Sequence, residues 1–248
     1  MMSILYMDIL NQLEKGVLRA ASYINGQWEV HPEVKEKILE VFRTSPIAVK
    51  DGFRDKEAFI HPVHFDQDSG IRMPPGGSSV RRGCFLARGV VIMPPSYINV
   101  GAYVDQDSMI DSHVLVGSCA QIGKRVHLSA GVSVGGVLEP VGSRPVIIED
   151  DVFIGAGSAL VEGVLVKSHA VLGMGVRLSG TLPIYDTVHK TIYRGEVPSR
   201  AVVVAGSRGL CGEFAHQHQL SLQCAVIIKY RDEGTDAKVV LEDVLREK

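Results

Sequence analysis

The stretch VGSCAQIGKRVHLSAGVSVGG, Val116 to Gly136, carries a branched aliphatic residue at every sixth position. Helices repeat near 3.6 residues and extended strands near 2, so neither element explains a period of six. The same phase continues in two runs: Leu86, Ile92, Ile98, Val104, Ile110, Val116, Ile122, Leu128 and Val134, then Ile148, Ile154, Leu160, Val166, Leu172, Leu178 and Ile184. A repeat this short and this persistent predicts a parallel β-helix, in which three six-residue faces form one triangular coil.

The residues between these positions suit the corners of such a coil. The residue after each aliphatic one is usually small or acidic, as at Asp105, Asp111 and Gly117. One coil cannot bury its aliphatic side chains alone, so stacked coils share a continuous core. We therefore predict a mainly β fold, a left-handed parallel β-helix of hexapeptide repeats.

The register breaks once, between Val134 and Ile148, where the aliphatic spacing is fourteen. Counted as two steps of six, this spacing predicts that about two residues bulge from a coil. Loops at such breaks are often functional. A second irregular stretch, residues 185–199, predicts a strand-rich excursion before the last coil.

The two ends have a different pattern. Residues 4–24 carry apolar residues at helical spacing, and Pro32 opens a second amphipathic segment, PEVKEKILEVFR. The C-terminal part holds an apolar strand, SLQCAVIIKY, and a short amphipathic helix, LEDVLREK. We expect an N-terminal helical domain over 1–70, the β-helix over 71–206 and a C-terminal strand and helix extension over 207–248.

Composition excludes several classes of protein. The 26 basic and 28 acidic side chains give a net charge of −2, so nothing attracts nucleic acid or an anionic membrane in general. The apolar runs are too short for a membrane helix and no export signal opens the chain, which predicts a cytoplasmic protein. The four cysteines form no CxxC pair and are expected to be free thiols: Cys84, Cys119, Cys211 and Cys224.

Fold class alone leaves the activity open, because β-helices of this kind serve acyltransferases, zinc hydratases and scaffolds. A zinc site for hydration needs three histidines. The histidines of the repeat region, His113, His127, His169 and His189, share no spacing that fits the coil. We therefore expect no metal.

Four segments resemble the tetrahydrodipicolinate N-succinyltransferase family of lysine biosynthesis and together span nearly the whole chain. The core segment is INVGAYVDQDSMIDSHVLVGSCAQIGKRVHLSAGVSVGGVLEP, and the others are LRAASYINGQWEVHPEVKEKILEVFR, GIRMPPGG and SLQCAVIIKY. The resemblance implies transfer of an acyl group from a coenzyme A thioester, succinyl-CoA or acetyl-CoA, to the amine of a 2-amino-6-oxopimelate-type acceptor. It also implies a homotrimer with active sites between neighbouring β-helices.

The same resemblance implies roles for two residues. Asp111 in MIDS corresponds to the carboxylate that holds or deprotonates the acceptor amine. Arg72 in IRMPP corresponds to the arginine that grips an acceptor carboxylate, for which its planar fork is suited. The residue pattern alone favours for Asp111, as for Asp105 and Asp107, a role as a turn aspartate that binds local backbone amides, and the resemblance shifts the interpretation of Asp111 to catalysis. His127 is interpreted as structural.

Coenzyme A is expected in a groove beside the later coils. Gly136, Ala156 and Gly175 are the candidate contacts, because small residues let backbone amides approach a ligand closely. Corner geometry is the alternative reason for these small residues.

Three positions depart from the family. Gly157 and Ala159 in FIGAGSALVEG stand where the family has arginine and glutamate, and His113 stands where tryptophan is usual. These changes predict an altered acceptor or donor, with acetyl-CoA used at least as well as succinyl-CoA. The alternatives are a paralogue similar to the acyltransferase of tabtoxin biosynthesis and, in another class, a non-catalytic β-helix scaffold.

Overall fold

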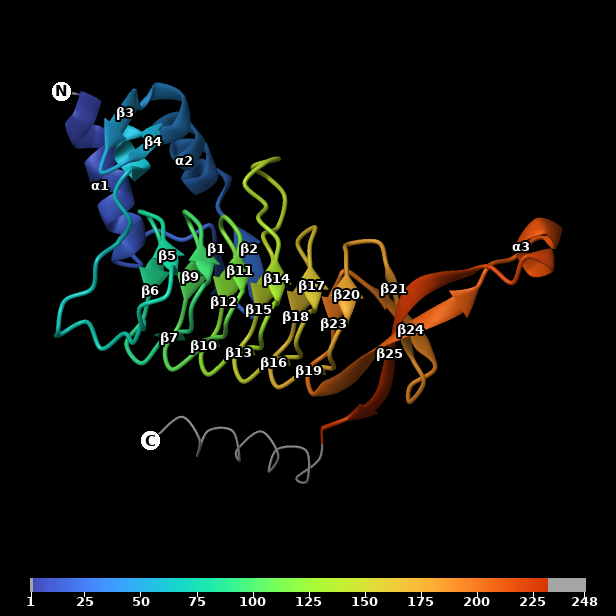
Figure 1. Ribbon diagram of the computed structural model, residues 1–248. Coiled ribbons are helices and arrows are strands. Elements are labelled where there is room, and N and C mark those ends of the chain that lie inside the picture. Colours follow the sequence, from blue (N-terminus) through green and yellow to red (C-terminus); the bar gives the residue numbers. More distant parts are fainter. Residues whose placement is uncertain (1, 232–248) are drawn as a thin grey trace.

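The computed structural model describes residues 2–231, and its body is a three-sided prism of short parallel strands (Figure 1). The first face contains β5 (Ser79–Val80), β8 (Tyr97–Ile98), β11 (Leu115–Val116), β14 (Ser133–Val134), β17 (Ala159–Leu160) and β20 (Arg177–Leu178). The second face contains β6 (Phe85–Leu86), β9 (Tyr103–Val104), β12 (Gln121–Ile122), β15 (Ile147–Ile148), β18 (Leu165–Val166) and β23 (Glu196–Val197). The third face contains β7 (Val91–Ile92), β10 (Met109–Ile110), β13 (His127–Leu128), β16 (Phe153–Ile154), β19 (Val171–Leu172) and β24 (Ala201–Gly209).

The second residue of each short strand points into the prism, as the six-residue period predicts. Ile110, Val116 and Ile122, one from each face, are at most 1% exposed and belong to one continuous core. Buried serines close the corners: the Ser96 hydroxyl donates to the Asp111 carbonyl at 2.7 Å, and the Ser108 hydroxyl, two faces later, donates to the Gly123 carbonyl at 2.7 Å. The predicted parallel β-helix is therefore present over the whole aliphatic register up to Leu178.

The expected two-residue bulge is wrong. Val134 on the first face and Ile148 on the second belong to consecutive faces, so fourteen residues replace one step of six and the insertion is eight residues long. The inserted loop is held at both sides. The fully buried Lys35 donates from Nζ to the Ser143 carbonyl at 2.5 Å, and Arg144 donates to two carbonyls of the last coils.

The N-terminal part is less helical than expected. Helices α1 (Met2–Glu14) and α2 (Pro32–Thr44) form, but β1 (Ala21–Ile24) pairs with β2 (Gln27–Val30), and β3 (Ile47–Lys50) pairs with β4 (Phe53–Lys56) before the short η1 (Glu57–Phe59). The sequence Asn25-Gly26 supplies the two positive-φ residues that a tight hairpin needs, and this signal outweighs the helical spacing.

The β1–β2 hairpin covers the second face of the prism. Trp28 packs with Ile147 and Leu165, and its Nε1 donates to the Glu149 carboxylate at 2.9 Å. The Arg19 guanidinium carbon lies 3.5 Å from the centre of the Tyr103 ring on the same face. The outward residues Gln121, Ile147 and Leu165 of the second face are thus buried by the N-terminal segment.

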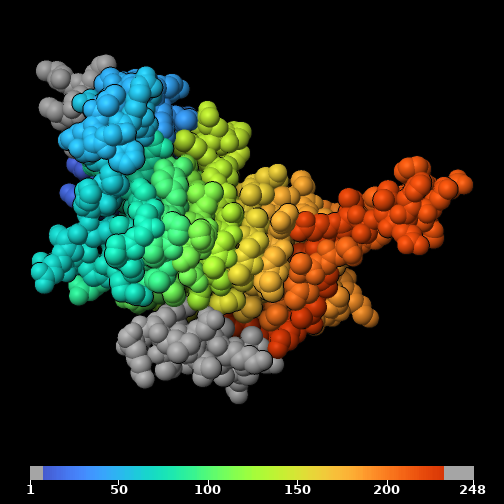
Figure 2. Space-filling view, viewed as in Figure 1, coloured from blue at the N-terminus to red at the C-terminus, as the bar shows by residue number. Residues whose placement is uncertain are grey.

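The C-terminal part leaves the prism as a projecting arm (Figure 2). Strands β21 (Pro183–Asp186) and β22 (Thr191–Arg194) form a hairpin that contains Ile184, so this residue is buried outside the coil register. The arm consists of β24, α3 (Glu213–Gln217) and β25 (Ser221–Tyr230), which confirms the predicted strand SLQCAVIIKY. The predicted helix LEDVLREK lies outside the described residues.

A buried carboxylate near the base of the arm predicts acid sensitivity. Burial alone would raise the pKa of Asp186, but hydrogen bonds from Tyr230, His189 and two backbone amides lower it to about 2. This pKa lies below the value of 3.8 expected for the unfolded chain, so the ionised Asp186 stabilises the fold above pH 3.8 by about 2 kcal/mol. About 1 kcal/mol of this stabilisation is lost when the pH falls to 3. Urea unfolding at pH 6 and pH 3 tests this. The variant Asp186→Asn should lose less stability than the wild type between the two pH values, and an equal loss would contradict the assignment.

Candidate active site

Asp111 lies at the corner between the third and first faces, immediately after β10. The corner has the same form in successive coils, and we call residues 111–114, 129–132, 155–158 and 173–176 the Asp111 corner row. The Asp111 side chain is half-buried, and its Oδ1 accepts the Ser112 backbone N–H at 2.7 Å. Among the described residues, this is the one hydrogen bond to the carboxylate, so Oδ2 remains for another partner.

Two of the three candidate coenzyme A contacts lie in this row. By strand register, Ala156 is two coils and Gly175 three coils beyond Asp111, or about 10 and 14 Å along the prism at the usual strand spacing. Ala156 is exposed, and a side chain added at Gly157 or Gly175 would meet no atom within 4 Å. The row is therefore open at these glycines, and Met174, which is 78% exposed, projects from its last coil.

Gly136 lies elsewhere. It follows β14 at the far edge of the first face and starts the inserted loop, where a Cβ would come within 2.8 Å of the Ser118 nitrogen. Close packing between neighbouring coils is sufficient reason for this glycine. The structure does not bring it to the Asp111 corner row.

Arg72 extends the third face beyond β7 toward the N-terminal end. It forms a single parallel bridge with Val91, and its side chain is exposed. Val91 pairs in turn with Met109, so Arg72 is two strands, roughly 10 Å, from the strand that carries Asp111. The two residues lie on one side of the prism with open surface between them.

Of the three departures from the family pattern, His113 lies beside Asp111, and Gly157 and Ala159 lie two coils farther along the prism. His113 is exposed at φ +62° in the same turn, Gly157 has φ +69° in the same corner row, and Ala159 begins β17 on the first face beside it. His127, by contrast, faces outward on the third face and contacts the Phe153 ring at 5.0 Å between ring centres.

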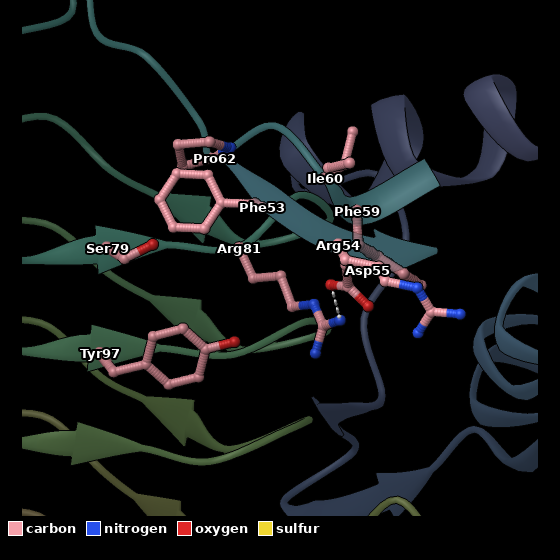
Figure 3. A pocket seen from close by; sticks show the side chains of 9 residues that line it. All are labelled: Phe53, Arg54, Asp55, Phe59, Ile60, Pro62, Ser79, Arg81 and Tyr97. Atoms are coloured by element: carbon pink, nitrogen blue, oxygen red, sulfur yellow. Dashed lines mark hydrogen bonds and ion pairs between the residues drawn. The ribbon is translucent and has the colours of Figure 1, made fainter. Parts of the chain in front are cut away.

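Sequence reasoning missed a cleft on the N-terminal side of this corner (Figure 3). It has a volume of about 320 Å³ and lies between the β3–β4 hairpin and the first face, with these lining residues: Phe53, Arg54, Asp55, Phe59, Ile60, Pro62, Ser79, Arg81 and Tyr97. A second hollow of about 300 Å³ shares Ser79 and Tyr97 with it and reaches Ser96 and His113. The cleft therefore opens toward Asp111. An eighteen-residue alignment of coils would have found Ser79 and Tyr97, because they precede Leu115 by two and one coils.

Other features give no competing site in the described part of the chain. Two hollows beside Trp28 lie on the second face, away from Asp111. No group of three His, Cys, Asp or Glu side chains within residues 2–231 is arranged to hold a metal. The four repeat-region histidines lie at separate corners, faces and turns. No described helix has the length and apolar character to cross a membrane.

Comparison with known proteins agrees with the fold. The hexapeptide repeat of succinyl-transferase matches residues 145–179. A Campylobacter jejuni chain described as a 2,3,4,5-tetrahydropyridine-2-carboxylate N-succinyltransferase superposes with a TM-score of 0.52 at 15% identity, covering 91% of this chain and 62% of that one. These matches confirm the left-handed β-helix of hexapeptide repeats.

Sequence relatives extend over almost the entire chain. The 2,3,4,5-tetrahydropyridine-2,6-dicarboxylate N-succinyltransferase of Nitrobacter winogradskyi is 45% identical over 96% of this chain and 88% of its own length. Those of Sodalis glossinidius and Acinetobacter baylyi are 42% and 43% identical, over 96% of this chain and 89% and 88% of their own. The chain therefore belongs to the 2,3,4,5-tetrahydropyridine-2,6-dicarboxylate N-succinyltransferase family.

Proposed function

We propose that this protein transfers the succinyl group of succinyl-CoA to the amine of tetrahydrodipicolinate in its open, 2-amino-6-oxopimelate form. The observation that carries the proposal is the position of Asp111, between a hollow on one side and the open part of the corner row on the other. The names of the relatives support the same reaction. The proposal includes a cytoplasmic enzyme of the lysine pathway.

In the proposed reaction, the acceptor amine attacks the thioester carbonyl of succinyl-CoA. The Asp111 carboxylate accepts the amine proton as the new C–N bond forms, the C–S bond breaks, and coenzyme A leaves as the thiol after taking up a proton. The hydrogen bond from Ser112 fixes Oδ1, which orients Oδ2 toward the substrate. Arg72 binds one acceptor carboxylate on the N-terminal side.

The pantetheine arm of coenzyme A follows the corner row toward the C-terminal coils. Its chain has as many bonds as about four extended residues, roughly 14 Å, which is the distance from Asp111 to the coil of Gly175. The Ala156 amide and the Gly175 carbonyl are the backbone groups left for the pantetheine, because the Gly175 amide already donates to the Ala156 carbonyl at 2.9 Å. Gly136 remains a candidate contact for a part of the donor that crosses the first face.

We further propose a homotrimer that associates through the third face. Its outward positions form an almost wholly apolar, half-buried row: Val91, Met109, His127, Phe153, Val171 and Val202. Sedimentation at micromolar concentration should therefore give a trimer, because closed threefold contacts suit a prism. The variant Phe153→Lys should shift it to monomer, whereas Val188→Lys on the exposed β21–β22 turn should not. A monomeric wild type would contradict the proposal.

The choice of donor tests the departures at Gly157 and Ala159. The missing arginine and glutamate remove a charged partner for a dicarboxylic group, which is the reason to expect acetyl-CoA to be used at least as well as succinyl-CoA. The names of the relatives do not favour acetyl-CoA, so that expectation stays a prediction. Thiol release with each donor and 2-aminopimelate measures the preference. If the prediction holds, the paired Gly157→Arg and Ala159→Glu variant should shift the donor preference toward succinyl-CoA. A wild type that already prefers succinyl-CoA to acetyl-CoA by tenfold or more would contradict the prediction.

The same assay separates an enzyme from a scaffold. A scaffold would release no thiol from either donor with any amine. Acylated 2-aminopimelate, identified by mass, is the result expected here.

A further inference from the structure

The proposed acceptor carries two carboxylates, and Arg72 accounts for one. The second also needs a cation, because a carboxylate that loses water without a partner is strongly destabilised. We propose that the cleft beside the β3–β4 hairpin, with Arg81 as its cation, binds the acceptor carboxylate farthest from the reacting amine. This inference rests on the proposed function and adds to it a specificity site for dicarboxylates.

Arg81 is held in place before any ligand arrives. One terminal nitrogen donates to the Asp55 carboxylate at 2.6 Å, and the guanidinium carbon lies 5.1 and 4.7 Å from the ring centres of Phe42 and Phe59. The side chain is 19% exposed. A guanidinium has five N–H donors, so the contacts with Asp55 and with the Tyr97 hydroxyl leave others for an anion. Figure 3 shows the group between Asp55 and the Tyr97 ring.

The charge and shape of the cleft suit one end of a dicarboxylate. Arg54 and Arg81 outnumber Asp55, so the lining has an excess positive charge. Tyr97 and Ser79 add hydroxyl groups on the first face, and burial raises the pKa of Tyr97, so its hydroxyl stays protonated and able to donate.

The spacing also fits. Tyr97 and Ser79 lie one and two strands before Leu115, which belongs to the coil of Asp111, or about 5 and 10 Å along the prism. The carboxyl carbons of a pimelate are six bonds apart, as in two extended residues, or about 7 Å. With the amine at Asp111, the hollow that shares Ser79 and Tyr97 and reaches His113 gives the acceptor a path across the first face toward the cleft.

The test compares two acceptors that differ only at the distal end. With succinyl-CoA as donor, kcat/KM is measured for 2-aminopimelate and for 2-aminoheptanoate, which lacks the distal carboxylate. The variant Arg81→Gln should lose about 10- to 100-fold on 2-aminopimelate, the scale of a charged hydrogen bond, with little change on 2-aminoheptanoate or in the KM for succinyl-CoA.

Arg81 also contacts Asp55 of the β3–β4 hairpin, so its replacement could displace the hairpin. A second variant therefore tests the same cleft without removing this contact. Tyr97→Phe removes one hydroxyl and should cost about 3- to 10-fold on 2-aminopimelate alone. Its matched control is Tyr103→Phe, the equivalent position on the second face, which should change neither acceptor.

The outcomes separate the two proposals. Suppose that Arg81→Gln and Tyr97→Phe acylate both acceptors and keep the wild-type ratio of kcat/KM for 2-aminopimelate to kcat/KM for 2-aminoheptanoate. The carboxylate site is then overturned, and the proposed function stands. Absence of acylation by the wild type, with every acceptor and donor, overturns the proposed function first.

Discussion

Replacing Asp111 by Asn should lower turnover by about 10²-fold or more, the usual scale for loss of a general base. The substitution keeps the shape of the side chain, and its amide oxygen can still accept the Ser112 N–H that the carboxylate accepts at 2.7 Å. It removes the charge and the site that takes the amine proton. The KM for succinyl-CoA and the unfolding midpoint in urea should change little. Initial rates of thiol release with 2-aminopimelate give the measurement.

The chain provides a matched control for this variant. Asp105 occupies the same repeat position one face earlier, and its Oδ1 accepts the Gln106 N–H at 2.8 Å. The two carboxylates therefore have the same local turn role, but Asp105 is at a different corner. Asp105→Asn should leave turnover near the wild-type value. Equal rates for both variants would return Asp111 to the turn role that its residue pattern also allows.

Replacing Ile154 by Ala should destabilise the fold by about 2–5 kcal/mol. The side chain is fully buried in the middle of the prism, between Leu128 of the coil before and Leu172 of the coil after. Coils share one core, so the cavity would be lined by three coils and would not collapse easily. Urea unfolding, followed by circular dichroism, gives the free energy.

The control for this variant is Ile192→Ala. Ile192 lies in β22 and is 50% exposed, so the same three-carbon truncation should cost less than about 1 kcal/mol. Equal losses in the two variants would show that the core is not continuous through Ile154.

The sequence predicts the prism well because one physical rule repeats without exception over most of it. Each inward position needs a branched aliphatic residue, and the fifteen agreeing positions from Leu86 to Leu178 leave little room for another fold. The rule fails where the chain leaves the coil. The predicted length of the inserted loop was wrong. A spacing of fourteen residues equals two six-residue steps with two inserted residues, or one step with eight inserted residues, and periodicity cannot choose between them. The contacts of Lys35 and Arg144 that hold the loop join segments distant in sequence.

The candidate site was predictable in part. The coil phase places Asp111, Ala156 and Gly175 in one row, and the structure has them there. The cleft around Arg81 was not predictable, because one wall comes from the β3–β4 hairpin, which lies in the region 1–70 that was expected to be helical. The substrate contacts of Arg72 and Asp111 stay predictions, as do the coenzyme A contacts of Gly136, Ala156 and Gly175.

The corner row has a consequence for how this architecture can change its substrates. All side chains that flank the row repeat once per coil, so separations along the prism come in increments of about 4.8 Å, the distance between paired strands. Duplication or deletion of a whole coil would change the distance between the acceptor site and the donor site by one such increment. Every side chain would keep its direction. Substrate length in such a protein is therefore set by a whole number of coils, and evolution can adjust it by copying eighteen-residue units without redesigning a pocket.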